Sequence, residues 1–240
     1  MTRTRRAEWS DERELMRMHV EALFAHDERG RLVRVNEPSG GDAPQFFLGR
    51  TRQGSECRFR YDVEEETALE LEALCVDAPD ADGSSPGWSD PSRYESVLAR
   101  TAPVQKTWAG PVYCFPVDLP ASSGTVLVTV ENLDLLRPRM KDWIGDVATG
   151  QPFVAVVSHG QAVSICCSVR TTSAADEAGV ETAVEFRGRG HAVDAVAAWG
   201  RAVRELGRTP LYSTSWGNLA SQAVAAKVGL IRFGSDLHLT

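Results

Sequence analysis

The sequence lacks several features that would have assigned it to a class at once. No segment approaches the ~18 consecutive apolar residues that a membrane helix needs. Arg3, Arg5 and Arg6 stand near the start, but no apolar run follows them, unlike in a secretory signal. The five cysteines, including adjacent Cys166 and Cys167, have neither a metal-site spacing nor the even number of a disulfide framework. We therefore expect a cytoplasmic protein with reduced, mostly buried cysteines and no bound metal.

The sequence also has fewer positively than negatively charged residues. Lys and Arg number 26 against 33 Asp and Glu, which gives a formal net charge of −7. Binding to nucleic acid needs clustered Lys and Arg, so the charge argues against such a partner. Apolar residues make up 42% and charged residues 25%, as in ordinary globular proteins. We expect no nucleic-acid or membrane partner, and a small-molecule amine suits the negative charge better. We also expect a monomer or homodimer.

Residues 1–120 carry no motif that assigns a function. Apolar periodicity and turn residues nevertheless predict an α+β domain. The expected elements are a helix starting at Ser10-Asp11-Glu12, strands Leu32 to Val35, Gln45 to Gly49 and Cys57 to Tyr61, a helix Glu64 to Val76, an exposed loop Asp77 to Asp90, and a helix Pro91 to Arg100.

The second half is more regular, and the turn-rich segment Pro120 to Gly124 is the best boundary before it. We expect one domain over 1–120 and another over 121–240. The expected elements of the second are strand Thr125 to Val130, helix Leu133 to Val147, strand Phe153 to Val157, turn Ser158 to Gln161, strand Ala162 to Val169, a strand up to the glycine loop, a helix from Ala192 to Leu206, strand Leu211 to Thr214, helix Asn218 to Val228 and strand Ile231 to Leu239.

A glycine-containing turn between a strand and a helix is the most informative feature, and it occupies Val180 to Ala192. Such a turn leaves backbone N–H groups unpaired at the positive end of the helix dipole, which favours a bound phosphate. It is not a P-loop, since no Lys-Ser or Lys-Thr follows the glycines, and it lacks the three glycines of the dinucleotide fingerprint. The turn therefore predicts a phosphorylated cofactor in a less common setting.

Two motifs in this half resemble those of the GNAT N-acetyltransferases. Arg187-x-x-Gly190-x-Ala192 is similar to the Arg/Gln-x-x-Gly-x-Gly/Ala signature that holds the pyrophosphate of acetyl-CoA. Asn218-x-x-Ser221, followed at the family's offset by Gly229-Leu230, matches a second signature after the fifth strand. Both lie on the elements where the family carries them. The resemblance covers about the C-terminal half and implies a mixed sheet flanked by helices, with the cofactor between two central strands that splay apart. The order of elements in the first half leaves open a degenerate second copy of this fold.

The resemblance also implies which residues hold the cofactor, acetyl-CoA. Backbone N–H groups from Gly188 to Ala192 would bind the pyrophosphate, with charge-assisted contacts from Arg187 or Arg189. The strand end would pair with the pantetheine arm, and the second motif would approach the arm from the other side. The expected cofactor-binding residues are Thr182, Ala183, Val184, Arg187, Gly188, Arg189, Gly190, His191, Ala192, Asn218 and Ser221.

The reaction implied is transfer of an acetyl or short acyl group to a primary amine by direct attack in a ternary complex. A carboxylate must take a proton from the amine, and Glu181 is the first candidate, with Glu177 or Asp176 as alternatives. The family's usual tyrosine acid is replaced by Ala225, so Tyr212, a nearby hydroxyl or a water would protonate the leaving thiolate. The alternative function is a non-catalytic acyl-CoA sensor that signals through residues 1–120.

Overall fold

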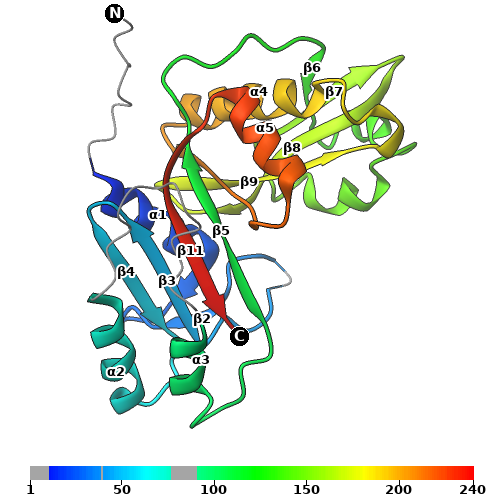
Figure 1. The fold of residues 1–240 in the computed structure, drawn as a ribbon. Coiled ribbons are helices and arrows are strands. Elements are labelled where there is room, and N and C mark those ends of the chain that lie inside the picture. Colours follow the sequence, from blue (N-terminus) through cyan, green and yellow to red (C-terminus); the bar gives the residue numbers. More distant parts are fainter. Residues whose placement is uncertain (1–10, 39, 77–90) are drawn as a thin grey trace, which may run out of the picture. The chain divides into compact units, whose positions relative to one another are not determined.

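The computed structural model describes residues 11–38, 40–76 and 91–240 of the chain (Figure 1). The chain forms two compact units, each built from more than one stretch of sequence. Unit 1 comprises Met1–Tyr113, Ser213–Asn218 and Arg232–Thr240, and unit 2 comprises Cys114–Tyr212 and Leu219–Ile231. The boundary expected between residues 120 and 121 falls inside unit 2. The loop expected from Asp77 to Asp90 lies outside the described residues.

The sheet of unit 1 has the strand order β4-β3-β11-β5. Strands β3 (Phe46–Thr51) and β4 (Gly54–Phe59) form a hairpin, and β11 (Ile231–Leu239) pairs antiparallel with β3. Strand β5 (Thr107–Cys114) follows β11. Sequence patterns did not predict β5, because Gly110 and Pro111 both interrupt it and such residues normally argue against an inner strand.

Helices cover the two faces of this sheet. Successive side chains of a strand point to opposite faces, so Phe46 and Leu48 of β3 face away from Phe47 and Gly49. The first pair packs with α2 (Glu65–Val76) and α3 (Ser92–Leu98) in one apolar cluster. The second faces α1 (Glu12–Leu23), where a Cβ at Gly49 would meet the Met16 sulfur at 2.3 Å. Strands β1 (Phe24–His26) and β2 (Leu32–Val35) form a separate two-stranded sheet.

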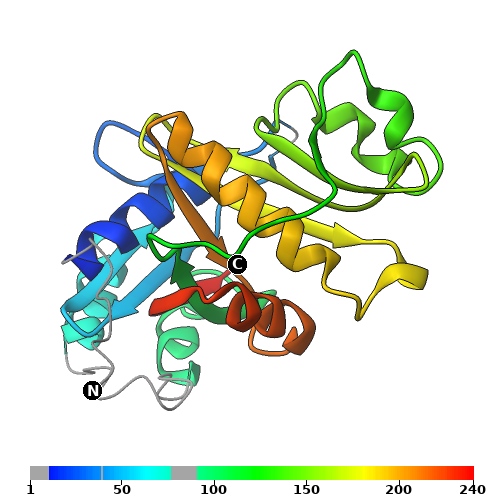
Figure 2. The same ribbon diagram turned by 90° about the horizontal axis from the view of Figure 1, so that it is seen from above.

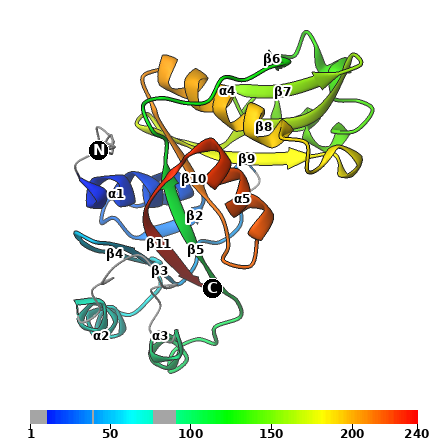
Figure 3. The ribbon, with the colours of Figure 1, turned by 45° about the horizontal axis from the view of Figure 1, so that its top comes forward.

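The sheet of unit 2 has the order β10-β9-β8-β7-β6 (Figure 3). Its strands are β6 (Thr125–Leu127), β7 (Phe153–Ser158), β8 (Gln161–Thr171), β9 (Ala175–Thr182) and β10 (Thr209–Ser213). Neighbours from β6 to β9 are antiparallel, whereas β10 runs parallel to β9. The predicted turn between β7 and β8 is confirmed: His159 and Gly160 both have positive φ, 51° and 75°, as a two-residue hairpin requires.

Helix α4 (His191–Glu205) crosses one face of β7, β8 and β9 (Figure 2). It buries Trp199 at the centre of that face. The other face is covered by two short 3₁₀ helices, η1 (Leu133–Leu135) and η2 (Lys141–Asp146), which pack on Phe153 and Ile165. Helix α5 (Leu219–Val228) packs beside α4.

The mixed sheet flanked by helices confirms the α/β class. One expected element is wrong: the continuous helix from Leu133 to Val147 is replaced by η1 and η2, since Pro138 cannot continue a helix. In the part of the chain that the structure describes, no helix has both the length and the apolar character needed to cross a bilayer.

Candidate functional site

Strands β9 and β10 run side by side only at their beginnings. Their parallel register pairs Thr209 with Ala175 and ends at Leu211 with Glu177. Strand β9 continues to Thr182, so five of its residues extend beyond the last pair. Among the described residues, this stretch has a strand neighbour only on its β8 side. The edge facing β10 can therefore accept an extended ligand by backbone pairing, as peptide-binding sheets do.

A β-bulge in β8 lies where the two strands part. The register of β8 against β9 shifts between Ser168 and Arg170, opposite Ala178 and Glu177. The additional residue is Val169, and a bulge of this kind bends its strand and increases the local twist. The end of the β9–β10 ladder thus coincides with a built-in irregularity of the sheet.

The chain leaves β9 through a short turn with two left-handed glycines. A 3₁₀ helix, η3 (Val184–Phe186), is followed by Gly188 with φ of 77° and Gly190 with φ of 90°, and α4 begins at His191. Only glycine adopts such angles without strain. A Cβ built at either glycine would have no atom within 4 Å, so the space over the turn is open. The expected glycine turn between a strand and a helix is present, and positive φ accounts for both glycines.

The turn presents a row of backbone donors. Among the described residues, no group accepts a hydrogen bond from the N–H groups of Gly188 to Ala192, and the cap residue Gly190 has no side chain to supply one. The row stands at the positive end of the α4 dipole. Five adjacent unpaired donors with positive φ at Gly188 and Gly190 can act as a cradle for an anion.

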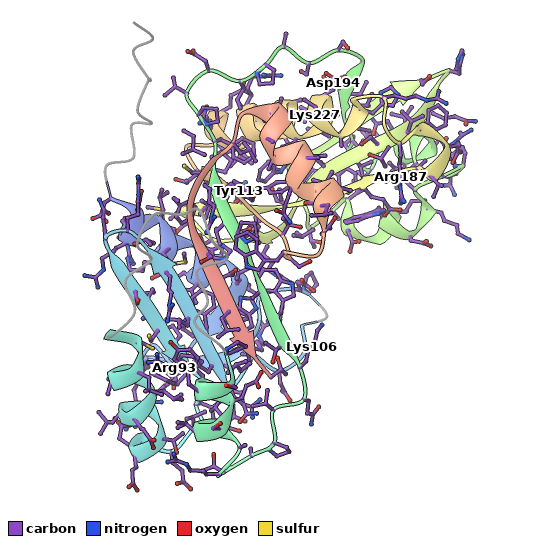
Figure 4. The ribbon with its side chains drawn as sticks, viewed as in Figure 1. Arg93, Lys106, Tyr113, Arg187, Asp194 and Lys227 are labelled. Carbon is purple, nitrogen blue, oxygen red and sulfur yellow. The ribbon has the colours of Figure 1, made fainter. Side chains whose placement is uncertain are left out.

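Basic side chains surround this turn. Arg187 is exposed, and its Nε donates to the Thr182 carbonyl at 3.1 Å (Figure 4). The Arg189 guanidinium lies 5.3 Å from the centre of the Phe186 ring, and that of Arg139 lies 5.1 Å from it. Arg139 also pairs with Glu185 at 2.8 Å. The stacked guanidinium groups hold positive charge beside the donors with modest cost in side-chain entropy.

Two of the predicted cofactor-binding residues at the end of β9, Thr182 and Ala183, already form hydrogen bonds within the protein. The Thr182 hydroxyl lies 2.8 Å from that of Ser164, and the Ala183 N–H donates to the Val163 carbonyl at 3.0 Å. Val184 is 72% exposed, so its apolar side chain is available to a ligand at the end of β9.

Glu181 lies on the face of β9 opposite α4. Its carboxylate accepts a hydrogen bond from the indole N–H of Trp143 in η2 at 2.5 Å. Gly179 and Glu177 share that face by strand alternation. A Cβ at Gly179 would collide with Val169 at 2.2 Å and contact Trp143 at 3.5 Å. The missing side chain at Gly179 thus makes room for Val169, and Trp143 lies beside it, where its indole orients Glu181.

The two other carboxylates near the start of β9 are buried. Glu177 is 2% exposed and Asp176 is fully buried on the α4 face. Ser168 donates to Asp176 at 2.7 Å, and Arg208 lies 3.1 Å from the same oxygen. Burial raises the pKa of Asp176 to about 6, although Ser168 and Arg208 oppose the shift. Asp176 is therefore enclosed by its own network, whereas Glu181 is exposed and can meet a substrate.

Tyr212 and Ser221 lie together in unit 2. The Tyr212 hydroxyl is 2.6 Å from that of Ser221 and 3.3 Å from the Ser221 carbonyl, which joins β10 to α5. Tyr212 is only 2% exposed. Ala225, which replaces the family's usual tyrosine, lies on the same helix as Ser221 and is fully buried. Its methyl group cannot donate a proton.

No family model matches the chain, and no curated protein matches it. Among solved structures, it resembles a GNAT-family protein from Novosphingobium aromaticivorans at 19% identity, with 57% of this chain and 65% of that one covered and a TM-score of 0.45. A GNAT acetyltransferase from Colwellia psychrerythraea matches at 13% identity over 89% of this chain and 82% of that one, with a TM-score of 0.49. A GCN5-related N-acetyltransferase from Kribbella flavida matches at 14% over 97% and 96%, with a TM-score of 0.48.

The order of elements in unit 2, with parallel strands that part before a glycine turn and a helix, is the one that the sequence motifs implied. The chain is similar in fold to these GNAT proteins.

Asn218, the first residue of the second motif, lies between β10 and α5. It immediately precedes α5, and its N–H donates to the Ser215 carbonyl at 3.0 Å. It belongs to the segment Ser213–Asn218, which clusters with unit 1. Its predicted contact with the pantetheine arm stays a prediction, as do the cofactor contacts of Ser221 and His191.

Sequence reasoning missed three side chains of the GNAT-like site. Trp143, Arg139 and Phe186 surround the end of β9 and the glycine turn, through the contacts described above. Trp143 and Glu181 are separated by 38 residues, so no local pattern could connect them. For Phe186 a local signal existed, because an aromatic residue directly before Arg187 can stack on a neighbouring guanidinium.

Proposed function

We propose that unit 2 binds acetyl-CoA at the start of α4 and transfers its acetyl group to a primary amine. The observation that carries the proposal is the row of five backbone donors from Gly188 to Ala192, for which the described part of the chain provides no acceptor. A helix start with unused donors and no capping side chain favours a diphosphate. Because backbone groups would bind the diphosphate, the turn needs its two glycines but no particular side chain.

The charge around the turn suits the same ligand. Arg187 and Arg189 flank Gly188, and Arg139 adds a third guanidinium within stacking distance of Phe186. Guanidinium groups form charge-assisted hydrogen bonds with phosphate oxygens that are about twice as strong as neutral ones. The protein as a whole is acidic, with a net charge of −7, so this basic turn is a local exception.

An extended arm leaving the diphosphate would follow the open edge of β9. The five residues from Ala178 to Thr182 lie beyond the β9–β10 ladder, and their outer edge has the length for an added strand. Val184 supplies exposed apolar surface beside the turn. Pantetheine carries two amide groups and an apolar portion, and both features match this edge.

The chemistry then needs a proton acceptor and a proton donor. The attacking amine forms a C–N bond at the thioester carbonyl, its proton passes to the Glu181 carboxylate, and the C–S bond breaks. Trp143 fixes the orientation of that carboxylate through its indole N–H. Tyr212 would return a proton to the departing sulfur, with Ser221 as the next hydroxyl in the chain. A CoA thiolate is a good leaving group, so this last transfer contributes less than the first.

The decisive test is thiol release by the full-length protein. Acetyl-CoA is incubated with polyamines, aminoglycosides or amino acids, and free thiol is measured together with the mass of the acetylated product. The proposal predicts thiol and product in equal amounts with at least one amine. Saturable CoA binding without thiol release from any amine would instead favour the acyl-CoA sensor.

The role of Glu181 is tested by a matched pair of variants. Glu181→Gln keeps the size of the side chain but removes the base, so turnover should fall about 100-fold while acetyl-CoA binding is retained. Glu205→Gln is the control, because Glu205 is an exposed carboxylate at the far end of α4 from the glycine turn. Equal turnover in both variants would remove Glu181 from the mechanism.

A further inference from the structure

Two cysteines of unit 1 pack into one apolar cluster although they come from different elements. Cys57 is on β4 and Cys75 is on α2, and the two thiols are near enough for Cys75 to affect the ionisation of Cys57. Cys75 is 4% exposed and belongs to the apolar cluster under α2, and Cys57 packs against that cluster at its margin. Both are free thiols.

Contacts on both sides of the pair fix its position. The Cys75 thiol donates back to the Leu71 carbonyl in its own helix at 3.1 Å. The Ser55 hydroxyl of β4 donates to the Cys75 carbonyl at 3.4 Å, so this end of α2 lies directly on β4. On the other side, Cys57 is opposite Leu48 in the β3–β4 hairpin. The two thiols are thus held between a paired strand and a packed helix.

We propose that Cys57 and Cys75 are a modification site, at which a low-molecular-weight disulfide such as glutathione disulfide closes a protein disulfide that fastens α2 to β4. This site is independent of the acetyl-transfer proposal, because it lies wholly in unit 1 and uses no residue of the glycine turn. Failure of either proposal leaves the other standing.

The exchange balances in two steps. The Cys57 sulfur, the more exposed of the two, loses its proton to solvent and attacks one sulfur of glutathione disulfide, releasing one glutathione thiolate that takes up a proton. Cys75 then loses its proton and attacks the Cys57 sulfur of the mixed disulfide, which releases the second glutathione. Two protein thiols are oxidised, and one glutathione disulfide is reduced to two glutathione thiols.

The surroundings make this exchange slow at neutral pH. The hydrogen bond with Cys75, followed by burial, raises the pKa of the Cys57 thiol far above its usual range. The acids Glu56 and Glu72 also face Cys57 and disfavour its thiolate, and Tyr94 lies near Cys75. Since only the thiolate attacks, the oxidation rate should rise about tenfold for each unit of pH near neutrality. The site therefore responds to sustained oxidation rather than to brief pulses.

The remaining cysteines provide an internal comparison. Cys166 and Cys167 are neighbours in β8, but successive strand residues point to opposite faces, so their thiols are directed apart. Both are fully buried, and burial raises the pKa of Cys167 to about 12. Cys114 donates to the Ile231 carbonyl at 3.6 Å. Among the five cysteines of the chain, only Cys57 and Cys75 come from two packed elements, share one apolar cluster and include a partly exposed thiol.

The test uses full-length protein equilibrated in glutathione buffers of increasing oxidised fraction. Samples are denatured in the presence of N-ethylmaleimide, which labels free thiols, and the intact mass is measured by mass spectrometry. They are then digested without reduction. We expect two fewer labels than in reduced protein, no retained glutathione, and a peptide pair linking Cys57 to Cys75. Oxidation should raise the melting temperature of unit 1 by roughly 10 °C, and dithiothreitol should reverse the shift.

Two variants complete the design. Cys75→Ser should keep glutathione on Cys57 as a stable mixed disulfide and show no increase in melting temperature, whereas Cys114→Ser should behave like the native protein. The proposal is overturned if the native protein retains all five thiols at every glutathione ratio, or if it carries glutathione on Cys57 without losing the Cys75 thiol. A Cys57–Cys75 disulfide that left the melting temperature unchanged would contradict the proposal that this bond fastens α2 to β4.

Discussion

Helices α1 and α4 begin in opposite ways. The Asp11 carboxylate accepts from the N–H groups of Arg13 and Glu14 at 3.0 and 3.1 Å, and acids occupy the first turn of α1. Helix α4 begins at Gly190 with no capping side chain, and the residue before it is Arg189. The first turn of α4 also contains an acid, Asp194, so the difference lies in the cap. Helix α1 carries its own capping anion, whereas α4 leaves its donors for an anion from outside. We call the capped start of α1 closed and the uncapped start of α4 open.

Each helix is also tied to its sheet by a buried carboxylate. In α1, His19 lies 2.8 Å from Asp236 of β11, and His238 approaches the same oxygen at 3.0 Å. In α4, Trp199 donates to Ser168 at 3.1 Å, and Ser168 donates to Asp176 of β9. Tying helices to strands in this way positions both helix starts.

The two carboxylates differ in how well their charge is compensated. Burial alone would raise the pKa of Asp236, but the interactions with His238 and His19 hold it below the usual value. Burial raises the pKa of Asp176 to about 6, because Ser168 and Arg208 compensate it less. The hydrogen-bond and charge partners of a carboxylate, rather than its depth of burial, therefore decide whether its charged form stabilises the fold.

The largest effect should come from giving α4 an anion of its own. Gly190→Asp places a carboxylate in the anion cradle, and Asp tolerates positive φ better than most residues. Repulsion and occupied donors should weaken CoA binding by about 100-fold, or ~2.7 kcal/mol, as measured by calorimetry. The matched control is Gly207→Asp, because Gly207 has φ of 74° and equally open space at the other end of α4. Similar losses in both variants would show that the effect comes from backbone strain.

The next largest effect concerns the anchor of α1. Asp236→Asn removes a charge that two imidazoles compensate, so unfolding in urea at neutral pH should require about 2 kcal/mol less. The pKa of Asp236 is lowered in the folded state. Its contribution is therefore present above the unfolded pKa of about 3.9 and is lost as the pH falls through the folded value. The difference between variant and native protein should shrink in acid.

The anchor of α4 should respond in the opposite direction. The folded pKa of Asp176, about 6, lies above the unfolded value, so its contribution is complete below about pH 4 and is lost as the pH rises through 6. Asp176→Asn mimics the protonated form, and its stability relative to native protein should improve over that interval. Parallel pH trends for Asp236→Asn and Asp176→Asn would contradict the difference in compensation.

The open start of α4 was predictable from sequence because it depends on local residues. Gly188 and Gly190 follow a strand pattern and precede a helical stripe, and both adopt the positive φ that such a turn needs. The closed start of α1 was equally local, since Asp11 precedes the first apolar turn. Its neighbour Ser10 lies outside the described residues.

What sequence could not supply is contact between distant segments. Strand β5 contains Gly110 and Pro111, and a Cβ at Gly110 would meet the Thr214 carbonyl oxygen at 1.8 Å, so the glycine serves a close approach of two remote stretches. The placement of His19 against Asp236 spans 217 residues. No periodicity encodes such a pair, because it depends on which strands become neighbours.

A smaller effect is expected from the charge beside the open helix start. Arg189→Gln removes one guanidinium near the donor row, which should weaken CoA binding about tenfold, or ~1.4 kcal/mol, and reduce its dependence on salt. Arg17→Gln is the matched control in α1, where Arg17 pairs with Glu14 and Glu21 on the helix surface. A tenfold loss in the control would indicate a general effect of net charge rather than a contact at the turn.

The smallest effect should come from opening the closed helix. Asp11→Ala leaves the N–H groups of Arg13 and Glu14 without their acceptor, so the free energy of unfolding should fall by about 1 kcal/mol, measured in urea. CoA affinity should not change, because Glu12 and Glu14 still repel an anion from the start of α1. If the opened α1 instead bound phosphate in calorimetry, unused donors alone would suffice for binding, and the arginines around α4 would lose their explanatory role.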